Sequence, residues 1–225
     1  MNDFPSLRTC RRAALTALFV CALTLTGCRS TYYTVMETFG KHKRDLLRDS
    51  LADAGEAQQE ATEQFKDALT QLKELTGFDG GELEKRYQAF KAEYDACEEA
   101  AGNVSGRIRK VEQIAGDLFG EWERELNQIS SPNLRADSRR KLGQTKARFE
   151  SLRTALVKAE SSMPPVLTQM KDYVLYLKHN LNAVAIGSLK TEADNISAEV
   201  NRLIGDMNRS IQQTESFVKE LEAQE

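Results

Sequence analysis

Apolar residues recur at alternating steps of three and four along most of this chain, and this spacing limits its fold more than any other feature. It is typical of long α-helices that bury one narrow stripe against each other. The longest stripe consists of Leu83, Tyr87, Phe90, Tyr94, Cys97, Ala101, Val104, Ile108, Val111, Ala115, Leu118 and Trp122. Because the flanking positions are mostly charged, this segment is predicted to be one amphipathic helix.

Three further segments have stripes of the same kind. The first is Leu47, Leu51, Ala54, Gln58, Ala61, Phe65, Ala68, Leu72 and Leu75. The third is Phe149, Leu152, Leu156, Ala159, Met163, Val166, Met170, Tyr173 and Leu177. The fourth is Leu189, Ala193, Ile196, Val200, Leu203, Met207, Ile211, Thr214, Val218 and Leu221, with a local stutter at its two consecutive steps of four. The polar member of the first stripe, Gln58, either fixes register as a buried residue or lies near solvent.

Short breaks separate the four segments. Gly77 is a predicted helix C-cap, Ser131 is an N-cap followed by Pro132 at the first helical position, and Ser188 is the expected N-cap of the last helix. The adjacent residues Pro164 and Pro165 fall inside the third stripe, where we expect a kink or a break. Breaks this short favour helices that run antiparallel to their neighbours.

The predicted fold class is therefore all-α. We expect helices of about 40 to 50 residues, roughly 60–75 Å long, in an elongated antiparallel four-helix coiled-coil bundle. Two splayed helical hairpins are the alternative. Residues 28–225 are expected to form a single helical coiled-coil domain after a cleaved signal peptide at residues 1–27.

The signal peptide is inferred from a basic start and an uncharged stretch. Three arginines precede the uncharged residues 13–26, which span only about 21 Å as a helix, too short for a bilayer core of roughly 30 Å. The stretch ends in Leu25-Thr26-Gly27-Cys28, which resembles the lipobox of bacterial lipoprotein precursors. That resemblance implies diacylation of the Cys28 sulfur and cleavage just before it. The alternative is an ordinary cleaved signal with a chance cysteine.

Cysteine usage and charge narrow the function classes. After processing, Cys97 is the one thiol left besides Cys28, so no intramolecular disulfide is expected, and its stripe position predicts burial. The net charge of −3 has no dense basic block behind it, which argues against nucleic acid. Phosphate-binding and zinc motifs are missing, so no nucleotide, metal or other cofactor is expected, and we interpret the chain as a non-enzyme.

Two groups of residues are candidate functional surfaces. Lys41, Lys43 and Arg44 form a basic patch close to Cys28, where anionic headgroups would attract it; a solvated helix face is the alternative. His179, Asn180 and Asn182 form a candidate polar cluster near the end of the third segment. Local hydrogen bonding and capping is the simpler interpretation of that cluster.

Three local patterns also indicate a family. They are His42-Lys43-Arg44-Asp45, Phe78-Asp79-Gly80-Gly81 and Leu177-Lys178-His179-Asn180-Leu181-Asn182-Ala183. With them the chain resembles the DUF2959 family of Gram-negative coiled-coil lipoproteins, nearly end to end from Tyr32-Tyr33 through the fourth segment. The resemblance implies a fold and a cellular location, and it implies no activity, substrate or assigned site.

The expected function is therefore that of a membrane-anchored envelope lipoprotein with a structural, scaffolding or protein-interaction role. Its partners would be the membrane, through the N-terminal lipid, and envelope proteins or a second copy. Arg29 departs from the Asp that retains lipoproteins in the inner membrane, which favours the outer membrane facing the periplasm. The alternative is a periplasmic carrier of a lipid or other apolar ligand, with Met163, Met170 and Tyr173 lining an opening in the bundle.

Overall fold

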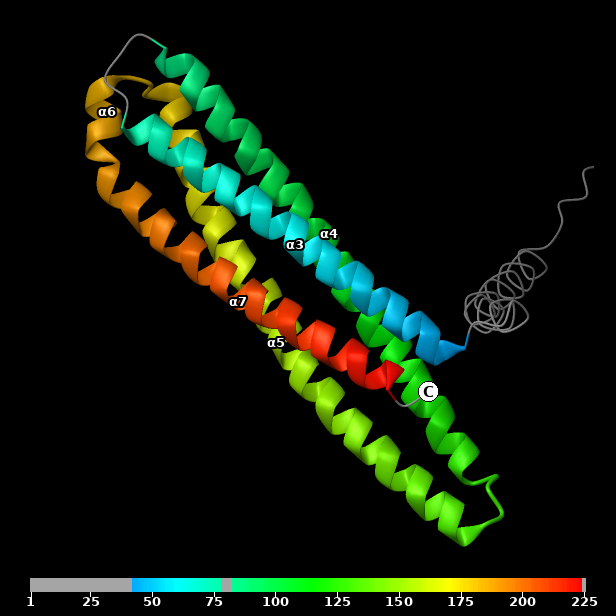
Figure 1. The fold of residues 1–225 in the computed structure, drawn as a ribbon. Coiled ribbons are helices and arrows are strands. Elements are labelled where there is room, and N and C mark those ends of the chain that lie inside the picture. Colours follow the sequence, from blue (N-terminus) through cyan, green and yellow to red (C-terminus); the bar gives the residue numbers. More distant parts are fainter. Residues whose placement is uncertain (1–41, 78–81, 224–225) are drawn as a thin grey trace, which may run out of the picture. The chain divides into compact units, whose positions relative to one another are not determined.

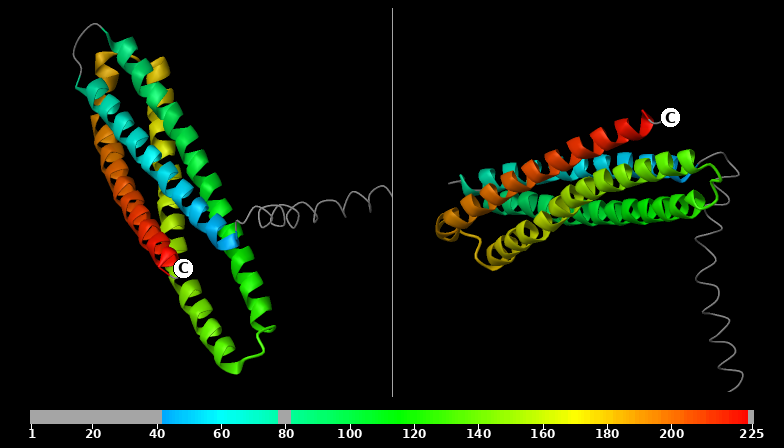
Figure 2. Two further views of the ribbon diagram at one scale, coloured as in Figure 1. Left: turned by 45° about the vertical axis from the view of Figure 1, so that its right-hand side comes forward. Right: turned by 90° about the horizontal axis from the view of Figure 1, so that it is seen from below.

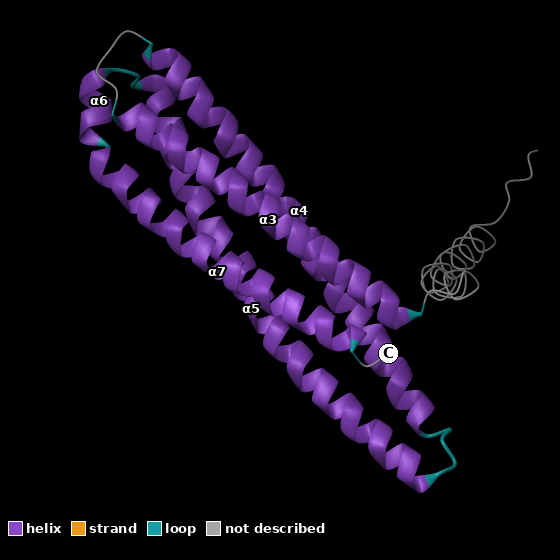
Figure 3. Ribbon diagram, in the orientation of Figure 1, coloured by secondary structure: helices purple, strands orange, loops and turns teal. Residues whose placement is uncertain are grey.

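The structure is a computed structural model that describes residues 42–77 and 82–223. The chain divides into two compact units, Met1–Leu46 and Leu47–Glu225. Every regular element in the described ranges is an α-helix, which confirms the predicted all-α class (Figure 3). None of these helices is both long and apolar enough to cross a bilayer. The predicted signal peptide lies outside the described residues.

Five helices make up the described part of the chain. They are α3 (Lys43–Thr76), α4 (Leu83–Leu126), α5 (Pro132–His179), α6 (Ala183–Ser188) and α7 (Lys190–Glu222). The second and third predicted helices have the expected length, with 44 residues in α4 and 48 in α5. The first and last are shorter than expected, with 34 residues in α3 and 33 in α7. The α4–α5 hairpin consequently extends past the end of α7 (Figure 1).

The start of α5 has the predicted turn chemistry, and the end of α3 does not. The Ser131 side chain accepts a hydrogen bond from the Leu134 N–H, and Pro132 occupies the first position of α5. Proline fits there because its missing N–H would have no partner within the helix. At the end of α3, the predicted glycine C-cap does not take its left-handed form. The Gly77 backbone lies outside the left-handed region, and its N–H makes an ordinary helical hydrogen bond to the Lys73 carbonyl oxygen at 2.9 Å.

The start of α7 differs from the prediction that Ser188 caps it. Ser188 is the last residue of α6, and its hydroxyl donates to the Ala185 carbonyl oxygen at 2.7 Å. Leu189 occupies the N-cap position of α7 without any side-chain cap. The prediction failed because an extra short helix, α6, precedes α7. Asn182 caps α6, and its Oδ1 accepts a hydrogen bond from the Ala185 N–H at 2.9 Å.

The predicted stripes form the core of the second unit. All members of the first and third stripes are buried, including Gln58 with 0 % exposure, which decides between the two interpretations of that residue. The second stripe is buried from Tyr87 to Ala115. Burial of these stripes supplies the main force that holds such long helices in place.

The prediction for the end of the second stripe is wrong. Leu118 and Trp122 are only half-buried, and the buried positions there are Ile114, Phe119 and Leu126. A helix with 3.6 residues per turn drifts about 20° per heptad from a strict repeat of seven, so a long seam moves to neighbouring positions. The Phe119 ring also packs edge-on against Phe149 of α5, with centroids 5.5 Å apart.

The predicted stutter in the fourth stripe is absent. Ile211 and Val218 are half-buried, whereas Ser210 and Phe217 are buried in their place. With these two residues the seam of α7 keeps alternating steps of three and four to its end. The apparent stutter arose because an apolar residue next to a serine was taken as the seam position.

Helix α5 passes through Pro164 and Pro165 without a break, so the break we allowed for does not occur. Proline removes the hydrogen bond to the carbonyl four residues earlier, here those of Glu160 and Ser161. Both prolines and Ser161 are exposed, so water can replace the lost partners on that side of the helix. The buried stripe keeps its phase across the two prolines.

Where two of these helices meet, residues with higher numbers on one helix contact residues with lower numbers on the other. In the α4–α5 pair, Phe90 meets Tyr173 and Phe119 meets Phe149. Between α5 and α7, Arg148 Nη1 lies 2.7 Å from Glu220 Oε2 and Lys158 Nζ lies 3.0 Å from Asp206 Oδ1. Helix α3 contacts α4 through Asp53 and Arg107, and it contacts α7 through Thr62 and Met207. The ribbon views show α3 lying beside both helices (Figure 2).

Candidate functional site

The residues of the predicted lipidation site lie outside the described residues. These are Cys28 and the positions before it, Leu25, Thr26 and Gly27. Lys41 of the basic patch lies outside them as well. The structure therefore bears on Lys43 and Arg44 only, within that patch.

Lys43 and Arg44 occupy the first turn of α3, next to a backbone cap. The His42 N–H donates to the Asp45 carboxylate at 3.0 Å, which is one half of a capping box. An acidic residue in a first turn also suits the positive end of the helix dipole. The His42-Lys43-Arg44-Asp45 pattern thus starts a helix in this chain.

The predicted polar cluster forms the turn between α5 and α6. The Asn180 side chain donates to the Tyr176 carbonyl oxygen at 3.0 Å, and its backbone N–H bonds to Leu177. Asn182 caps α6, and its side-chain Nδ2 lies 3.4 Å from the Asn180 carbonyl oxygen. His179 is the exposed last residue of α5. The two asparagines are thus engaged in ending one helix and starting another.

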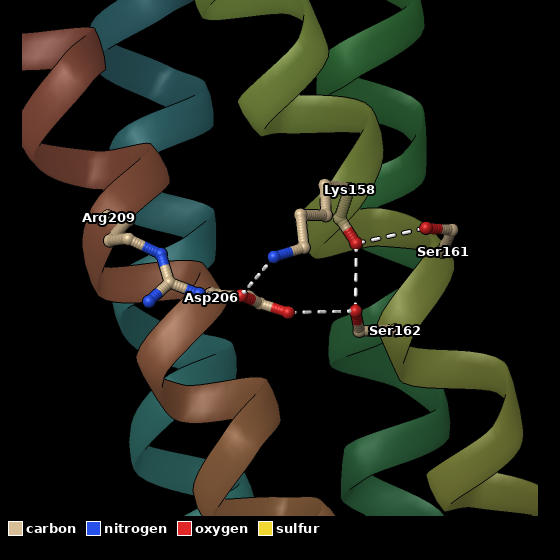
Figure 4. A network of polar contacts seen from close by, with 5 residues as sticks. All are labelled: Lys158, Ser161, Ser162, Asp206 and Arg209. Carbon is tan, nitrogen blue, oxygen red and sulfur yellow. Dashed lines mark hydrogen bonds and ion pairs between the residues drawn. The ribbon is translucent and has the colours of Figure 1, made fainter.

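A charged network that the stripes did not predict joins α5 to α7 (Figure 4). The Asp206 side chain, only 12 % exposed, accepts from Lys158 at 3.0 Å and also from Arg209. The Ser162 hydroxyl lies 3.2 Å from Asp206 Oδ2. Burial alone would raise the pKa of Asp206, but the hydrogen bonds from Lys158, Arg209 and Ser162 outweigh it and hold that pKa below its ordinary value.

A second unpredicted feature is a groove of about 520 Å³ between α5 and α7, which we call the α5–α7 groove. Its polar and charged wall is made by Gln169, Asp172, Glu192, Asn195, Glu199 and Arg202. The remaining lining consists of Tyr173, Tyr176, Leu189, Ile196 and Ala198. A pattern of stripes could not reveal it, because it depends on which residues of two helices face each other.

Tyr173 is the one residue of the predicted opening that lines this groove. Its ring stacks edge-on against Phe90, with centroids 5.7 Å apart, while its buried hydroxyl has no hydrogen-bond partner. Met163 and Met170 are buried in the core and are not part of the groove lining. Burial, followed by the negative charge of Glu192, raises the pKa of Tyr173 to about 12, so the phenol keeps its proton at neutral pH.

Polar side chains also interrupt the seam between α3 and α7. Thr62 Oγ1 lies 3.5 Å from Met207 Sδ. Gln58 lies one turn before Thr62 and Ser210 about one turn after Met207, so both occupy the same level of the seam. Both side chains are fully buried, and neither the Gln58 amide nor the Ser210 hydroxyl has a hydrogen-bond partner.

Ion pairs between helices mark the outer faces. Asp53 of α3 lies 2.9 Å from Arg107 of α4, and Glu112 of α4 lies 2.7 Å from Arg153 of α5. These groups are partly exposed, so each pair contributes modestly, about 0–1 kcal/mol. The charged side chains thus lie on the outer faces of the helices, and the apolar stripes lie inside. Among residues 42–77 and 82–223, no group of three or more His, Cys, Asp or Glu could hold a metal ion.

Long helices with buried apolar stripes, charged outer faces and a groove between α5 and α7 define the class of this protein: an all-α protein built from long amphipathic helices. The chain matches the family model described as "Protein of unknown function (DUF2959)" over residues 32–221. It belongs to that family, as the local patterns predicted. No curated protein matches it.

Two of the three patterns behind that resemblance lie at helix ends. The first begins α3 through its capping hydrogen bond, and the third forms the α5–α6 turn through two asparagines. The Phe78-Asp79-Gly80-Gly81 pattern lies outside the described residues. These patterns therefore set where helices begin and end.

Proposed function

We propose that this chain is a membrane-anchored lipoprotein of the bacterial cell envelope with a non-enzymatic scaffolding or protein-interaction role. In this proposal its helices form an antiparallel four-helix coiled-coil bundle, with knobs-into-holes packing along the seams. A diacylated Cys28 holds the chain in the outer membrane, facing the periplasm. Residues Lys41, Lys43 and Arg44 lie near the lipid and contact anionic headgroups.

The observation that carries the proposal is the division between inside and outside along helices of 33 to 48 residues. The apolar stripes are buried almost completely, and ion pairs such as Arg148–Glu220 bridge the outer faces. Such a bundle has already buried most of its apolar surface, so it interacts with other molecules through its charged faces and a few exposed apolar side chains. That is the surface expected of a scaffold.

Two exposed apolar side chains offer positions for capturing partners. Leu134, in the first turn of α5, is 64 % exposed, and Val184, in α6, is 83 % exposed. They lie at opposite ends of α5 along the chain. Single exposed apolar residues are ordinary on a protein surface, and their use here is as probe positions.

The test is photo-crosslinking in cells of the full chain with a photoreactive amino acid at Leu134, at Val184 or at the exposed polar residue Asp194. The proposal predicts that at least one position captures a defined envelope protein or a second copy of the chain. A matched chain with the probe at the buried position Leu156 should give intramolecular products only. Absence of any specific intermolecular product at all three exposed positions would contradict a scaffolding role.

A further inference from the structure

The α5–α7 groove has the size of a small-molecule site. Its volume of about 520 Å³ falls within the range of roughly 300–1,000 Å³ that such sites occupy. Apolar side chains from α7, among them Ile196 and Ala198, line it together with the rings of Tyr173 and Tyr176. A ligand with a short hydrocarbon segment would bury that segment against these surfaces.

Two buried polar atoms in the groove lining have no partner within the protein. The Tyr173 side chain is only 3 % exposed, and its hydroxyl makes no hydrogen bond. The carbonyl oxygen Oε1 of Gln169 is likewise buried and without a partner. Buried polar atoms are almost always satisfied in native proteins, so two unsatisfied oxygens in the lining of one groove favour a ligand that supplies the missing groups. Both oxygens have almost no accessible surface, so each side chain must turn toward the groove to meet that ligand. Gln169 Oε1 can only accept, so the ligand must donate.

The charged residues of the groove lining indicate the sign of the charge on that ligand. Asp172, Glu192 and Glu199 contribute three carboxylates, and Arg202 contributes the one cation of the lining. Arg202 forms an ion pair with Glu199, with 2.9 Å between Nη1 and Oε1. The carboxylates of Asp172 and Glu192 therefore give the groove a negative electrostatic potential. The influence of Glu192 on Tyr173 places negative charge close to the orphan hydroxyl. A cation with N–H donors satisfies both requirements.

We propose that the α5–α7 groove binds a protonated aliphatic amine of the diamine or polyamine class. The ammonium groups donate to Gln169 Oε1 and face the carboxylates, and the methylene chain lies on the apolar wall. The tyrosine rings add cation–π attraction. This site goes beyond the proposed scaffolding role and does not depend on it. An anion would be repelled by the carboxylates, and a purely apolar ligand would leave Asp172 and Glu192 without a counter-charge.

The test is isothermal titration calorimetry of the full chain in mild detergent at physiological salt, with putrescine and spermidine as probes. Tyr173→Phe and Glu192→Gln should each weaken binding about three- to tenfold, the loss expected for one hydrogen bond or one close charge. Glu56→Gln removes a carboxylate from a different groove, between α3 and α7, and should leave binding unchanged. Butane-1,4-diol, which has the chain of putrescine without its charge, should bind at least tenfold more weakly.

Three results would overturn the proposal: no binding of either amine, equal affinity in all variants, or equal affinity for the diol. A co-purified lipid that no amine displaces, detected by native mass spectrometry, would also overturn it. Tyr173→Phe keeps the ring and its contact with Phe90, so the fold should survive. Should it fail to fold, Glu192→Gln alters an exposed side chain and decides the matter alone.

Discussion

At the scale of single residues, Gln58 and Ser210 place polar groups in an otherwise apolar seam. Gln58 has 0 % exposure and neither amide atom has a partner. An unsatisfied buried polar group costs free energy, so its presence lowers the stability of the α3–α7 contact. A polar residue at one seam position can in return disfavour shifted alignments of the helices.

Replacing Gln58 by Met should therefore raise the free energy of unfolding by about 1–3 kcal/mol, because a side chain of similar volume fills the site without polar atoms. Urea unfolding followed by circular dichroism measures the change. The neighbouring variant Gln59→Met alters an exposed residue and should stay within about 0.5 kcal/mol of the parent. A destabilised Gln58→Met protein would mean that the amide has partners in solution.

Asp206 gives a prediction that depends on pH. Its folded pKa lies below the ordinary value of 3.8, because hydrogen bonds from Lys158, Arg209 and Ser162 outweigh the effect of burial. A depressed carboxyl pKa adds stability above the unfolded-state value, and that stability is lost as pH falls through the folded pKa. Asp206→Asn should thus destabilise the protein by about 1 kcal/mol at neutral pH, a figure reduced because Lys158 and Arg209 are largely exposed.

The difference between the parent and Asp206→Asn should shrink as pH falls below 3.8. Unfolding free energies measured at neutral pH and near pH 3 give the two ends of this dependence. Asp194→Asn removes an exposed carboxylate from the same helix and should show no comparable trend. A constant Asp206→Asn difference across this range would contradict the assignment of the lowered pKa to its three donors.

At the scale of elements, α5 shows that a packed face can outweigh local propensity. Pro164 and Pro165 would interrupt an isolated helix, yet the third stripe is buried on both sides of them. The packing of that stripe against α4 and α7 holds the helix together across the lost hydrogen bonds. The cost remains in the folded state and should be measurable.

Replacing both Pro164 and Pro165 by Ala should raise the free energy of unfolding by about 1–3 kcal/mol, since two backbone hydrogen bonds are restored at exposed positions. Chemical denaturation measures it, and hydrogen exchange should show greater protection in the same turn. The matched control is Pro132→Ala, at the first position of α5, where proline costs nothing and its removal should slightly destabilise the protein. Destabilisation by the double variant would instead show that packing needs the prolines.

The heptad pattern was enough to predict the four long helices, because a buried stripe needs only the right spacing. It failed where two neighbours compete for one position, as Ser210 does with Ile211 and Phe119 does with Leu118. The choice there depends on which helix lies opposite. The α5–α7 groove could not be predicted for the same reason, since its residues include both seam and flank positions of two helices.

At the scale of the whole molecule, our proposal assigns the location of this protein to a lipid on Cys28. The described helices include none that could span a bilayer. In our proposal, membrane attachment depends on the lipid at Cys28, with residues such as Lys43 and Arg44 assisting at the surface. Cys97 is the natural comparison, because it is buried with a pKa raised to about 12 by desolvation and is a poor nucleophile.

Metabolic labelling of the full chain with radioactive palmitate, expressed in a Gram-negative host, tests this claim most directly. The account predicts label in the parent and in Cys97→Ala, and its complete loss in Cys28→Ala. Lack of label in the parent, or label that persists in Cys28→Ala, would contradict it.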